Sequence, residues 1–160
     1  MEAKSASESR ISTAVVVLPG HTTQIGIMHG GELMKMMDNA AGVVSQRHCH
    51  LNPVTVLVEK MVFKESVEVG DLIVVEGELV YTGRTSMGVL VKVKRENLHT
   101  GDVNNHVMHG YWVMVALDEN GKPTPVPPLK IETPEQQKSF NEARDRINRS
   151  FILSKMSENR

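Results

Sequence analysis

The sequence predicts an α+β fold in which a five-stranded antiparallel sheet lies against one long helix. Three observations predict it. Residues 28–48 have helical periodicity, five segments between residues 12 and 117 have strand character, and a short glycine-containing turn joins two long strands. A length of 160 residues suits a single domain with a real core.

The predicted helix is apolar over most of its circumference, which indicates that it lies inside the protein. At about 100° per residue, one face collects the apolar residues Leu33, Met37, Ala40, Ala41 and Val44. Asp38 lies at the edge of this face. Because an unpaired buried charge is costly, two interpretations stay open: a hydrogen-bonded boundary aspartate, or a carboxylate kept for chemistry.

Gly30 and Gly31 open the helix. A bare backbone at a helix start leaves N–H groups and the positive end of the dipole facing any ligand, which is an oxyanion site in outline. A simple turn made by two glycines is the alternative. Asp38 follows Gly31 by seven residues, or roughly 10 Å of helix. If both act on one carbonyl carbon, they must come from two subunits.

The predicted strands come before and after this helix in the sequence. We expect a first strand over residues 12–18, a central strand over 54–63, a hairpin of residues 71–81 and 87–93, and a long strand over 103–117. Four prolines make residues 123–128 extended. Thr133, Pro134 and Gln136 have the pattern of an N-cap, a first helical proline and a capping box, so a second, surface helix starts there.

The predicted organisation is a flexible N-terminal arm over residues 1–10, one domain over 11–128, and a C-terminal helix and tail over 129–160. The 18 Lys and Arg nearly balance the 19 Asp and Glu, which argues against a nucleic-acid partner. A single cysteine, Cys49, no apolar membrane-length run and no signal-peptide pattern favour a cytoplasmic protein without a membrane partner. The histidines have no metal-site spacing, so we expect no metal.

An ordered set of short motifs runs through residues 12–146. The motifs are His29-Gly30-Gly31 with Leu33, Met34 and Asp38; Val54-Thr55-Val56 and Phe63; Val69-Gly70-Asp71; Gly83-Arg84-Thr85-Ser86-Met87; residues 115–123; and Pro125-Val126-Pro127-Pro128. With these motifs in this order, the sequence resembles the hot-dog-fold acyl-CoA thioester hydrolases of the cytosolic acyl-CoA hydrolase type.

The resemblance implies a hot-dog fold and hydrolysis of acyl-CoA to free CoA and a carboxylic acid. It also implies homodimers with active sites between subunits, often assembled as hexamers, and no cofactor, because coenzyme A is part of the substrate. Gly30 and Gly31 would polarise the thioester carbonyl, and Asp38 of the partner subunit would activate water or attack directly. His29 and the turn of Arg84, Thr85 and Ser86 would contact the CoA moiety.

One position departs from the family pattern. Thr23 stands where the family has an asparagine, and we include it among the expected catalytic residues. A hydroxyl has a single donor, so Thr23 keeps a second hypothesis open: a hot-dog module that binds acyl-CoA without hydrolysing it. A third class, a hydroxyacyl thioester dehydratase, would need a histidine paired with an acid, and His29 with Glu32 is the local candidate.

Overall fold

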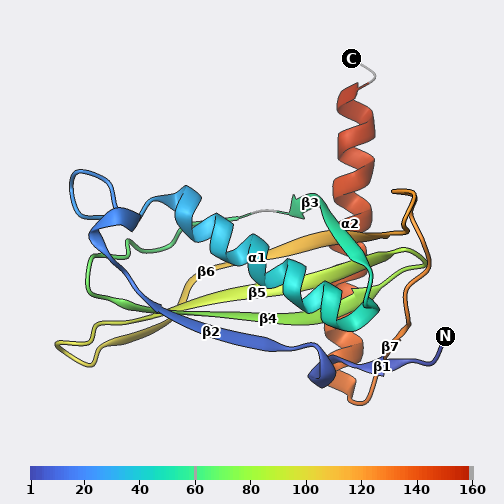
Figure 1. Ribbon diagram of the computed structural model, residues 1–160, viewed down its shortest axis with the longest axis horizontal. Coiled ribbons are helices and arrows are strands. Elements are labelled where there is room, and N and C mark those ends of the chain that lie inside the picture. The colour runs from blue at the N-terminus through green and yellow to red at the C-terminus, as the bar shows by residue number, and fades with distance from the viewer. Residues whose placement is uncertain (60, 159–160) are drawn as a thin grey trace.

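The computed structural model describes residues 1–59 and 61–158 of the chain. A five-stranded antiparallel sheet, in the order β2-β4-β5-β6-β3, curves along one long helix, α1 (Gly30–Cys49) (Figure 1). The strands are β2 (Ile11–Val16), β3 (Asn52–Glu59), β4 (Leu72–Thr82), β5 (Ser86–Glu96) and β6 (Val103–Leu117). This is the predicted arrangement of helix and sheet.

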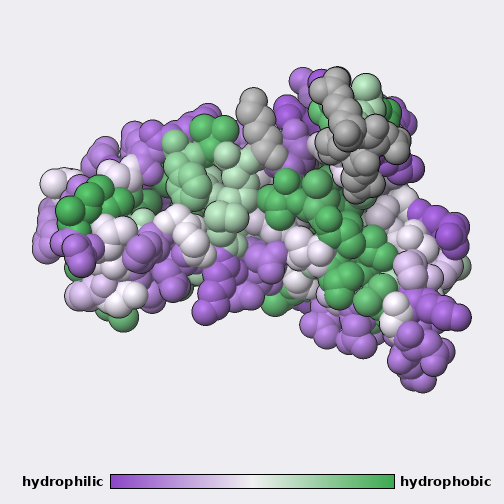
Figure 2. Space-filling model, turned by 90° about the horizontal axis from the view of Figure 1, so that it is seen from above, coloured by the Kyte–Doolittle hydropathy of each residue, from purple (hydrophilic) through white to green (hydrophobic). Residues whose placement is uncertain are grey.

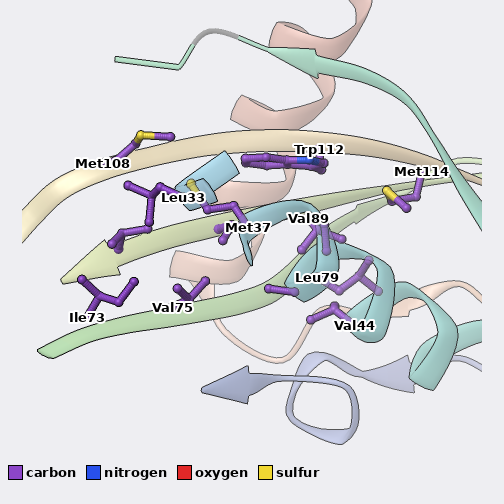
Figure 3. Packing of buried hydrophobic residues seen from close by; sticks show 14 of the residues in the cluster. Leu33, Met37, Val44, Ile73, Val75, Leu79, Val89, Met108, Trp112 and Met114 are labelled. Carbon is purple, nitrogen blue, oxygen red and sulfur yellow. The ribbon is translucent and has the colours of Figure 1, made fainter. Parts of the chain in front are cut away.

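The core lies between α1 and the concave face of the sheet. The predicted apolar face of the helix is buried: Leu33, Met37, Ala40, Ala41 and Val44 are at most 4% exposed. They meet alternate residues of the strands, among them Ile73, Val75, Leu79, Val89 and Trp112 (Figure 3). Helical and strand periodicity thus predicted the same interface from both sides.

The hairpin of β4 and β5 is confirmed by the register, in which Leu72 faces Glu96 and Thr82 faces Met87. The strand expected over residues 54–63 differs from its prediction. β3 ends at Glu59 and is an edge strand in this chain, not a central one. The prediction of a central strand was wrong because apolar residues on both faces do not mean burial here: Val54 and Val56 are 40% and 46% exposed.

The second helix, α2 (Pro134–Glu158), crosses the opposite face of the sheet and extends past its edge (Figure 1). Its predicted start is present: Thr133 Oγ1 accepts the Gln136 N–H at 3.1 Å. The Gln136 side chain returns to the Glu132 N–H at 2.7 Å instead of completing a standard capping box. Ala143 and Ile147 are buried against the sheet, while the end of the helix exposes Phe151, Ile152, Leu153 and Met156.

The N-terminal residues, which we expected to form a flexible arm, have defined structure. β1 (Lys4–Ser5) pairs in parallel with β7 (Leu129–Lys130), and a 3-10 turn, η1 (Ala6–Glu8), follows it. Ala6 and Ser9 are 2% and 0% exposed. This pairing is between distant segments, so no local pattern in the first ten residues could indicate it.

Candidate active site

The start of α1 presents free backbone donors. The carbonyl of His29, the residue before the helix, accepts the N–H groups of Glu32 and Leu33 at 3.1 and 3.2 Å. No acceptor among the described residues faces the N–H groups of Gly30 and Gly31. The His29 side chain is exposed and makes no capping bond. The helix start therefore has the open donors and positive dipole end that an oxyanion site requires.

An apolar cavity of about 300 Å³ lies beside this helix start. Its lining comes from the loop before α1, the first turn of α1 and the segment after β3: Ile27, Met28, Leu33, Phe63, Lys64, Glu65, Ser66 and Val67. Its apolar members would suit a hydrocarbon group placed next to the donors of Gly30 and Gly31. The sequence did not identify this cavity.

Asp38 lies on the third turn of α1 with its side chain exposed in this chain. Its Oδ1 accepts two hydrogen bonds, from Thr55 Oγ1 of β3 at 2.7 Å and from Trp112 Nε1 of β6 at 3.0 Å. Among the described residues nothing donates to Oδ2. The carboxylate is therefore held in place at one oxygen and left available at the other.

Thr55 and Trp112 are site residues that the sequence analysis missed. Thr55 is opposite Met114 of β6, just before a bulge, and its hydroxyl is also 3.3 Å from Met114 Sδ. A hydroxyl has one proton to donate, and the charged Asp38 Oδ1 at 2.7 Å is a stronger acceptor for it than the Met114 sulfur. The available signal was a polar residue between Val54 and Val56, within the otherwise apolar stretch of residues 53–58.

Thr23 lies in the loop that leads into α1, on the side of the helix start. Its N–H donates to Ile27 O at 2.8 Å, and its carbonyl accepts the N–H of Gly26, a residue with φ of 77°. Its Oγ1 is buried and has no hydrogen-bond partner within the described part of the chain. A buried hydroxyl left unpaired is costly, so this oxygen is suited to receive a group from outside the chain.

Arg84 and Thr85 lie in the turn between β4 and β5, and Ser86 is the first residue of β5. The carbonyl oxygens of Arg84 and Thr85 accept the N–H groups of Val126 and Ala116, which anchors the turn to the Pro-rich segment and to β6. The Arg84 side chain is exposed. Figure 1 shows the turn of this hairpin at the end of the molecule away from the start of α1. The loop that carries Thr23 leads into the start of α1.

One chain therefore carries the expected residues in three separate groups. Gly30, Gly31 and Thr23 lie at the helix start, Asp38 lies about 10 Å along the helix, and the β4–β5 turn that carries Arg84 lies at the other end of the molecule. The structure does not bring these groups together within one chain. If Asp38 and the glycine pair act on one carbonyl carbon, they must therefore come from two subunits.

Other reactive side chains do not extend the site. Burial raises the pKa of the Cys49 thiol and lowers the pKa of His48. Within residues 1–59 and 61–158, no three His, Cys, Asp or Glu side chains lie close enough to hold a metal ion. In the same residues no helix is both long and apolar enough to cross a membrane. Among the described residues, no hydrogen bond or ion pair joins the side chains of His29 and Glu32, the pair considered for a dehydratase.

Comparisons with known proteins agree on one family. A family model described as the thioesterase superfamily matches residues 25–101. Cytosolic acyl coenzyme A thioester hydrolase of Rattus norvegicus is 34% identical over 91% of this chain, which spans only 38% of that protein's length. The uncharacterized acyl-CoA thioester hydrolase YkhA of Bacillus subtilis is 33% identical over 92% of this chain and 85% of its own.

Solved structures give the same family. An apo-hexameric acyl-CoA thioesterase superimposes with a TM-score of 0.90 at 32% identity, covering 96% of this chain and 98% of its own. An acyl-CoA hydrolase from Staphylococcus aureus was solved with butyryl coenzyme A, coenzyme A and coenzyme A disulfide. It has a TM-score of 0.88 at 27% identity, and the match covers 98% of this chain and 95% of that one.

Variants of the Staphylococcus aureus enzyme, in which one asparagine, one aspartate or one threonine becomes alanine, are also similar structures. Its altered asparagine precedes the aspartate by 15 residues, and its altered threonine follows the aspartate by 17. In this chain Thr23 precedes Asp38 by 15 residues and Thr55 follows it by 17. The two spacings are therefore the same in the two proteins.

Proposed function

We infer the function from the family: the chain belongs to the hot-dog acyl-CoA thioester hydrolases of the thioesterase superfamily, and we propose that it hydrolyses acyl-CoA thioesters. The observation that carries the proposal is the Asp38 carboxylate, held at Oδ1 and free at Oδ2, on the same helix whose start offers two free N–H donors. These are the base and the oxyanion donors that acyl transfer to water needs.

In the proposed reaction, the carboxylate of Asp38 removes a proton from water as the water oxygen bonds to the thioester carbonyl carbon. The N–H groups of Gly30 and Gly31 bind the oxyanion that forms. The carbon–sulfur bond then breaks, the acid leaves, and the thiolate of CoA takes up the proton. Direct attack by Asp38 to give an anhydride, which water then opens, is the competing route.

We propose that the active unit is a homodimer joined along β3, because this edge strand and α1 expose apolar side chains side by side. The exposed residues are Val54 and Val56 on β3 and Met34 and Val43 on α1. Figure 2, which views the molecule from above relative to Figure 1, shows hydrophobic surface gathered on this side. Pairing two edges would cover both strands and bring Asp38 of one subunit toward Gly30 of the other.

Two similar structures are described as hexameric, which supports a hexamer of three such dimers for this chain. We propose that Arg84, Thr85, Ser86 and His29 contact the CoA moiety, because an exposed guanidinium and hydroxyl groups suit phosphate oxygens. No cofactor is needed in this scheme. Relatives named cytosolic support the expectation of a cytoplasmic location.

A non-catalytic module that binds acyl-CoA is the second candidate. Thr23 favours it, because a hydroxyl cannot reproduce both the donor and the acceptor of the amide that the family has there. The buried and unpartnered Oγ1 of Thr23 is available to a bound group under either function, and the feature that favours hydrolysis is the Asp38 carboxylate, held at Oδ1 and without a donor at Oδ2 among the described residues.

The test measures free thiol released from acyl-CoAs of graded chain length by the wild type and by Asp38→Asn. We expect turnover by the wild type, with an optimum among the acyl chains, and its loss in Asp38→Asn with little change in melting temperature. Tight binding of acyl-CoA without thiol release by the wild type would support the binding module instead.

A further inference from the structure

Trp112, the one tryptophan of the chain, sits in the core with its polar edge toward Asp38. The residue is 1% exposed, and Figure 3 shows it on the same side of the sheet as Leu33 and Met37 of α1. Its Nε1–H donates to Asp38 Oδ1 at 3.0 Å. An indole N–H is a donor only, so this contact requires an acceptor oxygen on Asp38.

The orientation of the indole is set by its neighbours. A β-carbon on Gly110 would lie 2.9 Å from Trp112 Cζ3 and 3.0 Å from Met61 Cγ. The missing side chain at Gly110 is therefore what lets the ring lie along β6. Because the ring is enclosed by packed atoms, its N–H cannot follow the carboxylate if Asp38 moves; Asp38 must come to it.

The second donor reaches the same oxygen. Thr55 Oγ1 lies 2.7 Å from Asp38 Oδ1, so two donors from two different strands meet one carboxylate oxygen of the helix. Oδ1 is then occupied, and the described residues leave Oδ2 without a donor. The carboxylate is asymmetric in its surroundings, and the geometry distinguishes the oxygen that is held from the oxygen that can react.

We propose that Trp112 is a positioning residue for Asp38, whose indole N–H, together with the Thr55 hydroxyl, fixes Oδ1 and so selects Oδ2 as the reacting oxygen. The inference rests on the proposed hydrolase function. It assigns the core ring a second role beside packing, and makes Gly110 an indirect part of the same arrangement.

The first experiment replaces Trp112 by Phe, which keeps an aromatic ring and removes the N–H. We expect kcat for the best acyl-CoA to fall by about 10- to 100-fold, while KM stays within about twofold, because positioning of the base is lost and substrate contacts are kept. Met108→Leu, a volume-conserving change at another buried position of β6, is the control and should keep wild-type kinetics. Wild-type kcat in Trp112→Phe would overturn the proposal.

The second experiment needs no activity and covers the case in which Trp112→Phe folds poorly. With one tryptophan in the chain, the indole N–H gives one resonance in a ¹⁵N-labelled sample. We expect a marked shift in Asp38→Ala, where the acceptor is gone, and a smaller one in Asp38→Asn, where an amide oxygen remains. An indole resonance that is the same in all three proteins would overturn the proposal.

The two experiments separate this inference from the proposed function. A wild type that hydrolyses no acyl-CoA, with an indole signal that responds to Asp38→Ala, contradicts the hydrolase but keeps the contact. A hydrolytic wild type with full kcat in Trp112→Phe keeps the hydrolase and contradicts the role of Trp112. Thr55→Val combined with Trp112→Phe should cost less than the product of the two single losses, because both donors hold one oxygen.

Discussion

Phe63 lies over Gly30 at the start of α1, so closely that a β-carbon on Gly30 would be 2.9 Å from Cζ of the ring. Phe63 also lines the apolar cavity beside the free backbone donors, and the absence of a side chain at Gly30 lets the ring take this place. Phe63 is 49% exposed, so its ring is free to move aside when the contact is altered. Gly30 therefore affects the site more than the fold.

From this contact we predict that Gly30→Ala lowers kcat/KM for acyl-CoA by about tenfold or more, because the displaced ring narrows the cavity next to the oxyanion donors. The melting temperature should change little. Adding Phe63→Leu should return part of the lost activity. Gly20→Ala is the matched control, because Gly20 lies in the 3-10 turn of residues 19–21 and the added carbon would meet no atom within 4 Å beyond its chain neighbours. An unchanged kcat/KM in Gly30→Ala would show that the ring does not shape the site.

The contact between Thr55 and Asp38 gives a second prediction. Thr55→Val keeps the shape of the side chain and removes the donor to Oδ1, so kcat should fall by about 10- to 100-fold. Thr55→Ser retains a hydroxyl and should recover most of that loss. Thr13→Val on the exposed strand β2 serves as the control for replacing a surface threonine. Equal kcat in Thr55→Val and Thr55→Ser would remove the hydroxyl from the mechanism.

Periodicity was enough to predict α1 and the β4–β5 hairpin, because each buries one face against a core. The same reasoning failed at β3, where apolar residues on both faces indicated a central strand and the chain has an edge. Periodicity within one chain cannot show that an edge strand pairs with another subunit. In the proposed dimer, β3 would have a strand on each side, as a central strand does.

Among the site residues too, some were predicted from local sequence and others were not. Asp38 and the pair Gly30 and Gly31 stand out locally, as a carboxylate in an apolar helix and as glycines at its start. Thr55 and Trp112 do not, because their role depends on contacts across 17 and 74 residues of sequence. A donor that arrives from a distant strand leaves no spacing pattern near the acceptor.

Arg84 supplies a third prediction. If its exposed guanidinium binds CoA phosphates, Arg84→Ala should raise KM for acyl-CoA several-fold and leave kcat nearly unchanged, because the phosphates lie far from the reacting bond. The KM of an acyl-pantetheine, which lacks those phosphates, should not respond. Arg144→Ala, an exposed arginine of α2 paired with Asp145, is the control. A rise in KM for both substrates would assign Arg84 a structural role in the turn.

The fourth prediction concerns pH and His48. Burial lowers the pKa of His48 below its ordinary 6.5, with the nearby Lys4 acting in the same direction, and its Nε2 donates to Pro127 O at 2.8 Å. The unfolded chain therefore binds the proton more readily than the folded one. The stability contributed by neutral His48 is complete above pH 6.5 and is lost as the pH falls toward the folded pKa.

We therefore expect the free energy of unfolding to fall between about pH 7 and pH 5, as measured by urea unfolding at several pH values. Burial also lowers the pKa of His109, which adds to the slope in the same direction. His48→Gln keeps a donor for Pro127 and cannot titrate, so its slope should be smaller. The exposed His99→Gln should keep the wild-type slope. Equal slopes in the wild type and His48→Gln would contradict this account.

The last prediction addresses the sharing of the site between subunits. Asp38 and Gly30 lie about 10 Å or more apart on one helix, so each proposed site takes one of them from each chain. A mixed dimer of Asp38→Asn and Gly30→Ala then has one site with both changes and one site with neither. Purified by two different affinity tags, it should have about half the wild-type activity per dimer, well above either parent. If each site lay within one chain, both sites of the mixed dimer would be damaged, and its activity would not exceed the mean of the two parents.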